Sequence, residues 1–167
     1  MILSTFVAIW AARLGWFLYS RIHNNNGIDS RFENMKKDNL KFFTAWTVQG
    51  VWVFLCLFSV LKVAQTRVIR RLSSLDYAGF ALWTFGFTLE VIADYQKRAF
   101  REIAENKGKF IDSGLWSISR HPNYFGEILL WTGISLSAFS GTRSPLVFIS
   151  PIFVSFLLIC ISGIPLL

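Results

Sequence analysis

Charged residues are scarce in this sequence. Asp, Glu, Lys and Arg make up 16% of its 167 residues, whereas soluble globular domains carry roughly 25%. Hydrophobic residues reach 53% and aromatic residues 17%. The few charges are also clustered, so that long stretches carry none, as a lipid bilayer requires of the segments that cross it. This composition excludes an ordinary soluble domain and predicts a membrane protein, with the bilayer as its first partner.

Cysteine and histidine are almost absent. The two cysteines, Cys56 and Cys160, lie inside apolar runs, and neither has a Cys or His at the spacing of a metal site. The two histidines, His23 and His121, are too few for a histidine-built di-metal oxygenase. The sequence therefore offers no support for a disulfide framework and predicts that the protein uses no metal.

The common nucleotide and hydrolase motifs are also missing. No segment matches G-x-G-x-x-G, G-x-x-x-x-G-K or G-x-S-x-G, so the sequence encodes neither a Rossmann fold, a P-loop nor a serine-hydrolase elbow. Any nucleotide cofactor must then be held by membrane helices and their loops. The excess of 17 Lys and Arg over 10 Asp and Glu could suggest a nucleic-acid partner. We interpret it instead as the positive charge that collects in cytoplasmic loops, and expect no nucleic acid.

Five apolar runs predict the architecture. They are continuous and do not alternate with period two, which favours helices over barrel strands. We expect an all-α, polytopic membrane protein, a single domain over residues 1–167, with about five transmembrane helices at residues 2–19, 44–61, 75–93, 124–139 and 145–167. The first run could be a signal peptide, but Arg13 lies inside it and no positive segment precedes it.

The distribution of Lys and Arg predicts the sidedness. Alternating spans place residues 20–43 and 94–123 on one side, and residues 62–74 and 140–144 on the other. The first side carries eleven Lys and Arg against five on the second. Because basic residues favour the cytosol, we expect the long loop between the third and fourth helices to be cytosolic. The membrane would be the endoplasmic reticulum in a eukaryote or the inner membrane in a bacterium.

Two pairs of glycines mark the third and fourth predicted helices. Gly79 and Gly86 are seven residues apart, as are Gly126 and Gly133. Two turns of helix separate the members of each pair, so both fall on one face. We expect these glycines to serve close helix packing.

A basic pair follows the third predicted span. Lys97 and Arg101 are four residues apart and project from one face of a helix that continues out of the bilayer. Such a pair can clamp a phosphate. Alternatively, both side chains snorkel toward anionic lipid head groups.

A second cluster opens the fourth predicted helix. Pro122 suits the first turn of a helix and disfavours helical geometry at His121, so a helix begins here. Its free N–H groups, beside Arg120, form a ready anion site. His121 alternatively serves only as a helix-entry residue and Tyr124 as an interface aromatic. Glu127 interacts either with the helix N-terminus and Arg120 or with the amide or hydroxyl of a ligand.

The segment resembles a known family in two blocks. These are Ala93-Asp94-x-Gln96-Lys97-x-x-Phe100-Arg101 and Gly114-Leu115-Trp116-x-x-Ser119-Arg120-His121-Pro122-Asn123-Tyr124-Phe125-Gly126-Glu127. They look like the steroid 5-alpha-reductase superfamily, in a branch near the 3-oxo-5-alpha-steroid 4-dehydrogenase C-terminal domain, and are similar to sterol delta-14 and delta-7 reductases. The motif Arg-His-Pro-x-Tyr-x-Gly alone is shared with isoprenylcysteine carboxyl methyltransferases.

The resemblance implies an NADPH-dependent oxidoreductase that acts on a carbon-carbon double bond of a hydrophobic lipid or steroid. Lys97, Arg101 and Arg120 would meet the cofactor phosphates, and Asp94 would orient the basic pair. Asn123 would bond the nicotinamide amide or ribose, with Glu127 fixing Asn123 or that amide. Trp116, His121 and Tyr124 would line the pocket. The proton donor is not assigned; Tyr19, Glu33 and Tyr124 are candidates by residue type.

Two other functions stay open. One is a lipid or isoprenylcysteine carboxyl methyltransferase that uses S-adenosylmethionine, which has less use for Lys97 and Arg101. The other is a membrane scaffold without catalysis. The last span ends at Gly163-Ile164-Pro165-Leu166-Leu167 without a polar tail, whereas similar family members continue into one. We therefore expect either a chain truncated at its C-terminus or a protein that binds NADPH weakly and reduces little, with the cofactor site open to water.

Overall fold

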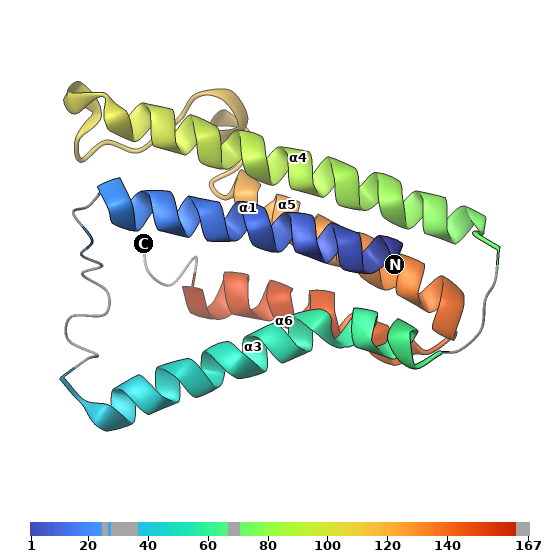
Figure 1. The fold of residues 1–167 in the computed structure, drawn as a ribbon. Coiled ribbons are helices and arrows are strands. Elements are labelled where there is room, and N and C mark those ends of the chain that lie inside the picture. Colours follow the sequence, from blue (N-terminus) through green and yellow to red (C-terminus); the bar gives the residue numbers. More distant parts are fainter. Residues whose placement is uncertain (25–26, 28–36, 67–70, 163–167) are drawn as a thin grey trace. The chain divides into compact units, whose positions relative to one another are not determined.

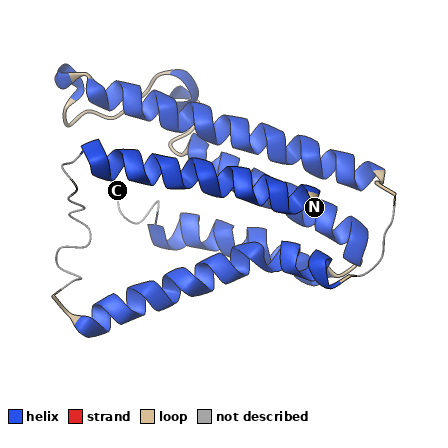
Figure 2. Ribbon diagram, viewed as in Figure 1, coloured by secondary structure: helices blue, strands red, loops and turns tan. Residues whose placement is uncertain are grey.

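The protein is helical throughout the part that the structure describes. A computed structural model describes residues 1–24, 27, 37–66 and 71–162. Within these ranges it contains five α-helices and no strand (Figures 1 and 2), which confirms the all-α prediction there. The helices are α1 (Ile2–Asn24), α3 (Asn39–Gln65), α4 (Ser74–Glu102), α5 (Pro122–Thr142) and α6 (Ile149–Phe156). Some residues that were named above or counted among the loop charges lie outside the described ranges. They are Arg31, Glu33, Lys36, Arg67, Arg70 and residues 163–167.

The chain divides into two compact units, Met1–Leu55 and Cys56–Leu167. The first holds α1 and the N-terminal part of α3, where Trp10 and Trp52 pack with ring centroids 6.0 Å apart. The second holds the end of α3 and the helices α4, α5 and α6. All the predicted cofactor-binding residues belong to the second unit, which is described by itself below. The single domain over residues 1–167 stays a prediction.

Two of the described helices, α1 and α3, are long and apolar enough to cross a membrane. Their apolar side chains are largely exposed, including Trp16 at 69% and Phe43 at 69%. Large apolar surfaces of this kind are stable against lipid and costly against water. A shorter apolar stretch covers Pro145–Ile161. Membrane crossing by all five helices stays a prediction.

The last predicted span is less regular than its hydropathy suggested. It opens with a 3-10 turn over Pro145–Phe148, continues as α6 and passes into a π-helical segment, Leu157–Ser162. Proline has no N–H to donate and therefore suits the opening turn. The segment is thus a continuous helical stretch whose hydrogen-bond pattern changes twice along its length.

Helices α4 and α5 pack through their glycines, as the spacing predicted. Gly79 lies opposite Gly133, and Gly86 lies opposite Gly126. A Cβ atom added to Gly79 would lie 2.6 Å from the carbonyl oxygen of Gly133, and one added to Gly126 would lie 2.6 Å from that of Gly86. Only glycine lets the two backbones approach this closely. The seven-residue repeat therefore fixes how α5 is aligned along α4.

A buried carboxylate joins the N-terminal end of α4 to the C-terminal end of α5, away from the loop that links these two helices. Asp76 is 3% exposed and accepts hydrogen bonds from the Ser73 backbone N–H at 2.8 Å and the Ser73 hydroxyl at 3.0 Å. The Ser140 hydroxyl of α5 also donates to Asp76, at 3.1 Å. The carboxylate thus completes a capping box at the N-terminus of α4 and joins two helices. This cluster holds the second unit together, while the site lies at the opposite end of α4.

Candidate functional site

The N-terminus of α5 lies where the sequence predicted it. Pro122 occupies the first turn, and His121 adopts a non-helical conformation with φ −143° and ψ 62°. The His121 backbone N–H donates to the Ser119 hydroxyl at 3.2 Å. The proline both ends the preceding loop and starts the helix. As a result, Arg120 and His121 lie directly before the first turn of α5.

The loop before α5 is fastened to α4 by two hydrogen bonds. The buried Trp116 indole N–H donates to the Ala93 carbonyl at 3.0 Å, and the Leu115 backbone N–H donates to Gln96 Oε1 at 3.0 Å. Gly114 has a φ of +61°, and a Cβ atom there would lie 2.6 Å from the Gln96 side chain. Glycine is thus favoured at this turn by its backbone conformation, and a larger residue would also push the Gln96 side chain away from Leu115. The two blocks of the family motif are brought together by these contacts.

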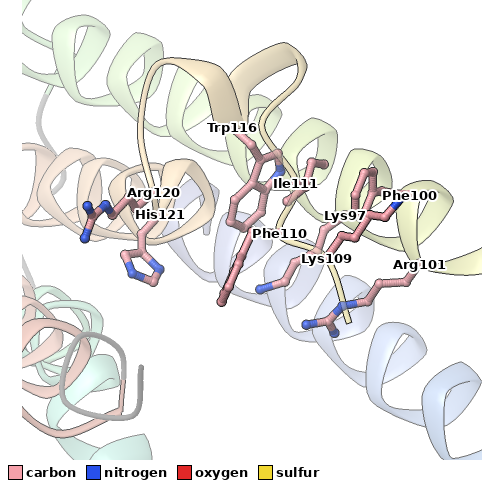
Figure 3. A pocket seen from close by; sticks show the side chains of 9 residues that line it. All are labelled: Lys97, Phe100, Arg101, Lys109, Phe110, Ile111, Trp116, Arg120 and His121. Atoms are coloured by element: carbon pink, nitrogen blue, oxygen red, sulfur yellow. The ribbon is translucent and has the colours of Figure 1, made fainter. Parts of the chain in front are cut away.

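A pocket of about 460 Å³ opens between the end of α4, the loop and the start of α5 (Figure 3). Five of the nine predicted cofactor-binding residues line it: Lys97, Arg101, Trp116, Arg120 and His121. Four further residues complete the lining: Phe100, Lys109, Phe110 and Ile111. The basic pair predicted on α4 and the anion site predicted before α5 therefore face the same cavity.

Lys97 is held over an aromatic ring. Its ammonium nitrogen lies 4.7 Å from the centroid of Trp116, a cation–π contact. Burial lowers the pKa of Lys97 below its ordinary value, the neighbouring Arg101 lowers it further, and Asp94 partly opposes this shift. A cation whose charged form is disfavoured gains when an anion arrives. The half-buried Lys97 is therefore suited to receive a negatively charged ligand.

His121 combines a stacked ring with an unsatisfied nitrogen. Its imidazole stacks on Tyr124, with centroids 4.7 Å apart and planes 6° from parallel. Burial lowers the pKa of His121, and the charges of Lys97 and Arg120 lower it further. Its Nε2 atom is buried and has no hydrogen-bond partner in the part of the chain that the structure describes. Buried polar atoms of this kind usually have a partner, so the atom is available to a ligand.

Asn123 carries the second such atom. Its Nδ2 donates to Asp94 Oδ1 at 3.2 Å, and its Oδ1 is buried without a hydrogen-bond partner among the described residues. A carboxylate can only accept, so Asp94 orients the asparagine amide with its oxygen turned away. The link between Asp94 and Asn123 was not predicted from the sequence. Glu127 lies one turn further along α5 and is half-buried.

Sequence reasoning missed Lys109, Phe110 and their neighbours in the pocket lining. Lys109 had been counted only among the loop charges. Its place follows from a turn in which Gly108 has a φ of +79° and the Lys109 backbone N–H donates to the Asn106 carbonyl at 3.0 Å. The segment Asn106-Lys107-Gly108 is typical of a turn. This pattern could have predicted that residues 109–111 run back toward α4.

The pocket is suited to an anion that also has an apolar part. Four of its lining residues are cations, namely Lys97, Arg101, Lys109 and Arg120, and none of the described lining residues is acidic. Phe100, Phe110, Ile111 and Trp116 provide apolar surface. The described residues contain no group of His, Cys, Asp and Glu that could hold a metal ion. The arrangement can therefore bind a phosphorylated organic ligand.

Comparisons with known proteins agree with the motif. The mouse 3-oxo-5-alpha-steroid 4-dehydrogenase 1 is 36% identical over 62 residues, which are 37% of this chain and 24% of that protein. The human protein of the same name is 31% identical over 77 residues, 46% of this chain and 30% of that protein. A probable O-methyltransferase ustE of Ustilaginoidea virens is 32% identical over 60 residues, 36% of this chain and 21% of that protein. No solved structure gives a significant match.

The matched segments span about a quarter to a third of the steroid dehydrogenases' own length. The family model described as a protein of unknown function (DUF1295) matches residues 1–167. This chain therefore belongs to the DUF1295 family, which is the steroid 5-alpha-reductase-like family.

Proposed function

We propose that this protein is a membrane-embedded reductase that binds NADPH in the pocket and reduces a carbon-carbon double bond of a steroid, sterol or other lipid enone. The observation that carries the proposal is the composition of the pocket. Four cations and no described acid surround an aromatic wall, and His121 in this lining has a buried nitrogen without a hydrogen-bond partner among the described residues, as has the oxygen of the nearby Asn123 in the chain. A phosphorylated nucleotide with an amide satisfies all of these groups.

Each group has a role in this proposal. Lys97, Arg101 and Arg120 bind phosphates through charge-assisted hydrogen bonds. Asn123 Oδ1 accepts from the nicotinamide amide or a ribose hydroxyl, and Asp94 holds the Asn123 amide in that orientation. His121 offers Nε2 to the same ligand. Trp116 and Tyr124 keep Lys97 and His121 in place through the ring contacts described above.

Bound NADPH supplies a hydride, and the enone takes up that hydride and one proton to give the saturated product and NADP⁺. The protein's part is to hold the reacting groups together and to deliver the proton. Of the three candidates for proton donor, Tyr124 lies in the unit that contains the pocket. Glu33 is outside the described residues, and Tyr19 belongs to the other unit.

A methyltransferase is the second candidate, because a probable O-methyltransferase matches the same chain. Its methyl donor, S-adenosylmethionine, carries a sulfonium cation and no phosphate. S-adenosylmethionine also carries an ammonium and a single carboxylate, so its net charge is positive. A pocket in which every described charged lining residue is basic disfavours this net positive charge and gives Lys97 and Arg101 less to bind than NADPH does. The charge of the pocket thus favours the reductase.

Isotope transfer tests the proposal. Purified protein in lipid nanodiscs is incubated with a panel of steroid and other lipid enones and with NADPH deuterated at either face of nicotinamide C4. Mass spectrometry should find one deuterium in the saturated product from one of the two cofactors. Methyl transfer from labelled S-adenosylmethionine to a lipid, without deuterium transfer, would support the methyltransferase instead.

A further inference from the structure

One wall of the pocket is made by the turn after α4. This helix ends at Glu102, and a 3-10 turn over Ala104–Asn106 follows it. The Asn106 side-chain amide donates to the Phe100 carbonyl at 3.0 Å, which anchors the turn to the last residues of α4. Gly108 then turns the chain, so that Lys109 and Phe110 both line the pocket. These two residues come from a segment to which the motif assigns no role.

Phe110 is the open aromatic surface of the pocket. It is 83% exposed, whereas Trp116 is 8% exposed and already carries the ammonium of Lys97 over its ring. An exposed phenylalanine gains free energy when another apolar surface covers it. Of these two rings, Phe110 is therefore the one with a face available for a flat group of a ligand.

The cations lie on two sides of these rings. In the view of Figure 3, Phe110 and Trp116 lie between Arg120 and His121 on one side and Lys97, Lys109 and Arg101 on the other. A nucleotide ribose carries its base, a 2′-phosphate and a 5′-phosphate chain on one small ring. A nucleotide of this kind has anionic groups on two sides of its base, as Phe110 has cations on two sides (Figure 3).

We propose that Phe110 stacks against the adenine of the nucleotide, and that Lys109, with Arg101, binds the phosphate on the adenosine 2′-oxygen. This inference rests on the proposed function and deepens it, because it adds the turn after α4 to the residues that select for the 2′-phosphate. The phosphate chain that leads to the nicotinamide then lies toward Arg120 and the N-terminus of α5. Lys109 and Phe110 are adjacent in the chain, as the base and the 2′-phosphate are adjacent on the ribose.

Binding of adenosine 2′,5′-bisphosphate tests this inference without any turnover. The full chain in nanodiscs is titrated calorimetrically with this compound, with adenosine 5′-monophosphate and with NADPH. Phe110→Leu should weaken binding of the bisphosphate about tenfold, because it removes the stacking surface and keeps the apolar volume. Phe110→Trp keeps an aromatic stacking surface and should bind the bisphosphate like the parent chain. Lys109→Gln should weaken binding of the bisphosphate about tenfold and change binding of the monophosphate by less than about twofold.

The same loop offers matched controls. Ile118 is as exposed as Phe110, at 84%, but does not line the pocket, and Lys107 is an exposed lysine outside the lining. Ile118→Ala and Lys107→Gln should therefore bind all three compounds like the parent chain. A similar loss in these controls would show a general effect of the loop and overturn the assignment.

The possible failures can be told apart. If Phe110→Leu and Lys109→Gln bind the bisphosphate like the parent, while NADPH still binds and depends on Lys97 and Arg101, the inference is wrong and the proposed function stands. If the parent chain binds neither NADPH nor the bisphosphate, both are wrong.

Discussion

Lys97 and Arg101 are the residues on which cofactor selectivity is expected to depend most. Exchanging both for Ala should weaken NADPH binding by about 2 to 4 kcal/mol at low ionic strength, because two charge-assisted contacts to phosphate are lost. NADH, which lacks the 2′-phosphate, should lose much less. Equilibrium titration of both dinucleotides measures the difference. An equal loss for both dinucleotides, or none for either, would indicate that Lys97 and Arg101 extend toward anionic lipid head groups and do not bind the 2′-phosphate.

Binding of the anionic cofactor beside His121 is expected to depend on pH. In the ligand-free site, burial and the charges of Lys97 and Arg120 hold its pKa below the ordinary value of 6.5. An anion bound beside it raises that pKa, so binding takes up a proton and becomes tighter as the pH falls through the raised value toward the lowered one. NADP⁺ titrations between pH 8 and pH 5.5, a range set by the ordinary histidine pKa of about 6.5, should show this gain.

The matched variant for this test is His121→Gln. Glutamine keeps a polar side chain but cannot change its charge. The affinity of this variant for NADP⁺ should therefore vary with pH only through the titration of the phosphate itself. Parallel pH profiles for the parent and the variant would show that His121 does not face the anion.

At the scale of helices, the glycine contacts between α4 and α5 position the site. Gly126→Ala places a Cβ atom 2.6 Å from the Gly86 carbonyl oxygen and 2.8 Å from the Glu90 backbone nitrogen. The helices must move apart, and we expect a loss of about 1 to 3 kcal/mol in the free energy of unfolding. Denaturation of the reconstituted protein measures this loss.

Gly50→Ala in α3 is the control, because no atom of the described residues lies within 4 Å of the Cβ position there. Alanine is favoured over glycine in a helix by up to about 1 kcal/mol, so this variant should be as stable as the parent or slightly more stable. A Gly126→Ala protein as stable as the Gly50→Ala protein would contradict the close packing.

The elements that sequence reasoning found are those with a local or periodic signal. Glycines seven residues apart indicate one face of a helix, and a proline after His121 indicates a helix start; both signals led to the observed structure. The contribution of Phe110 could not be found in this way, because it depends on where a turn directs the chain. The bond from Ser140 to Asp76 was missed for a similar reason, because its partners lie 64 residues apart. The capping box of Ser73 and Asp76, three residues apart, has a local signal that could have been recognised.

At the scale of the whole molecule, the topology can be tested through α4. Its 29 residues extend roughly 43 Å, enough to cross the hydrocarbon layer. Single cysteines at Ser74 and Lys107, in a chain whose Cys56 and Cys160 are replaced by Ala, should be labelled from opposite faces of sealed vesicles. Lys107 should react from the cytosolic face. Labelling of both from the same face would show that α4 does not cross the membrane.

Whether the basic pocket holds NADPH can be measured directly through the stability of the purified protein. The thermal unfolding temperature of the purified protein is followed while NADPH, NADH or S-adenosylmethionine is added, because a ligand that binds only the folded state must raise it. If the pocket holds NADPH, the unfolding temperature should rise steadily with the NADPH concentration, rise less with NADH and stay unchanged with S-adenosylmethionine. A rise with S-adenosylmethionine and none with NADPH would contradict this assignment.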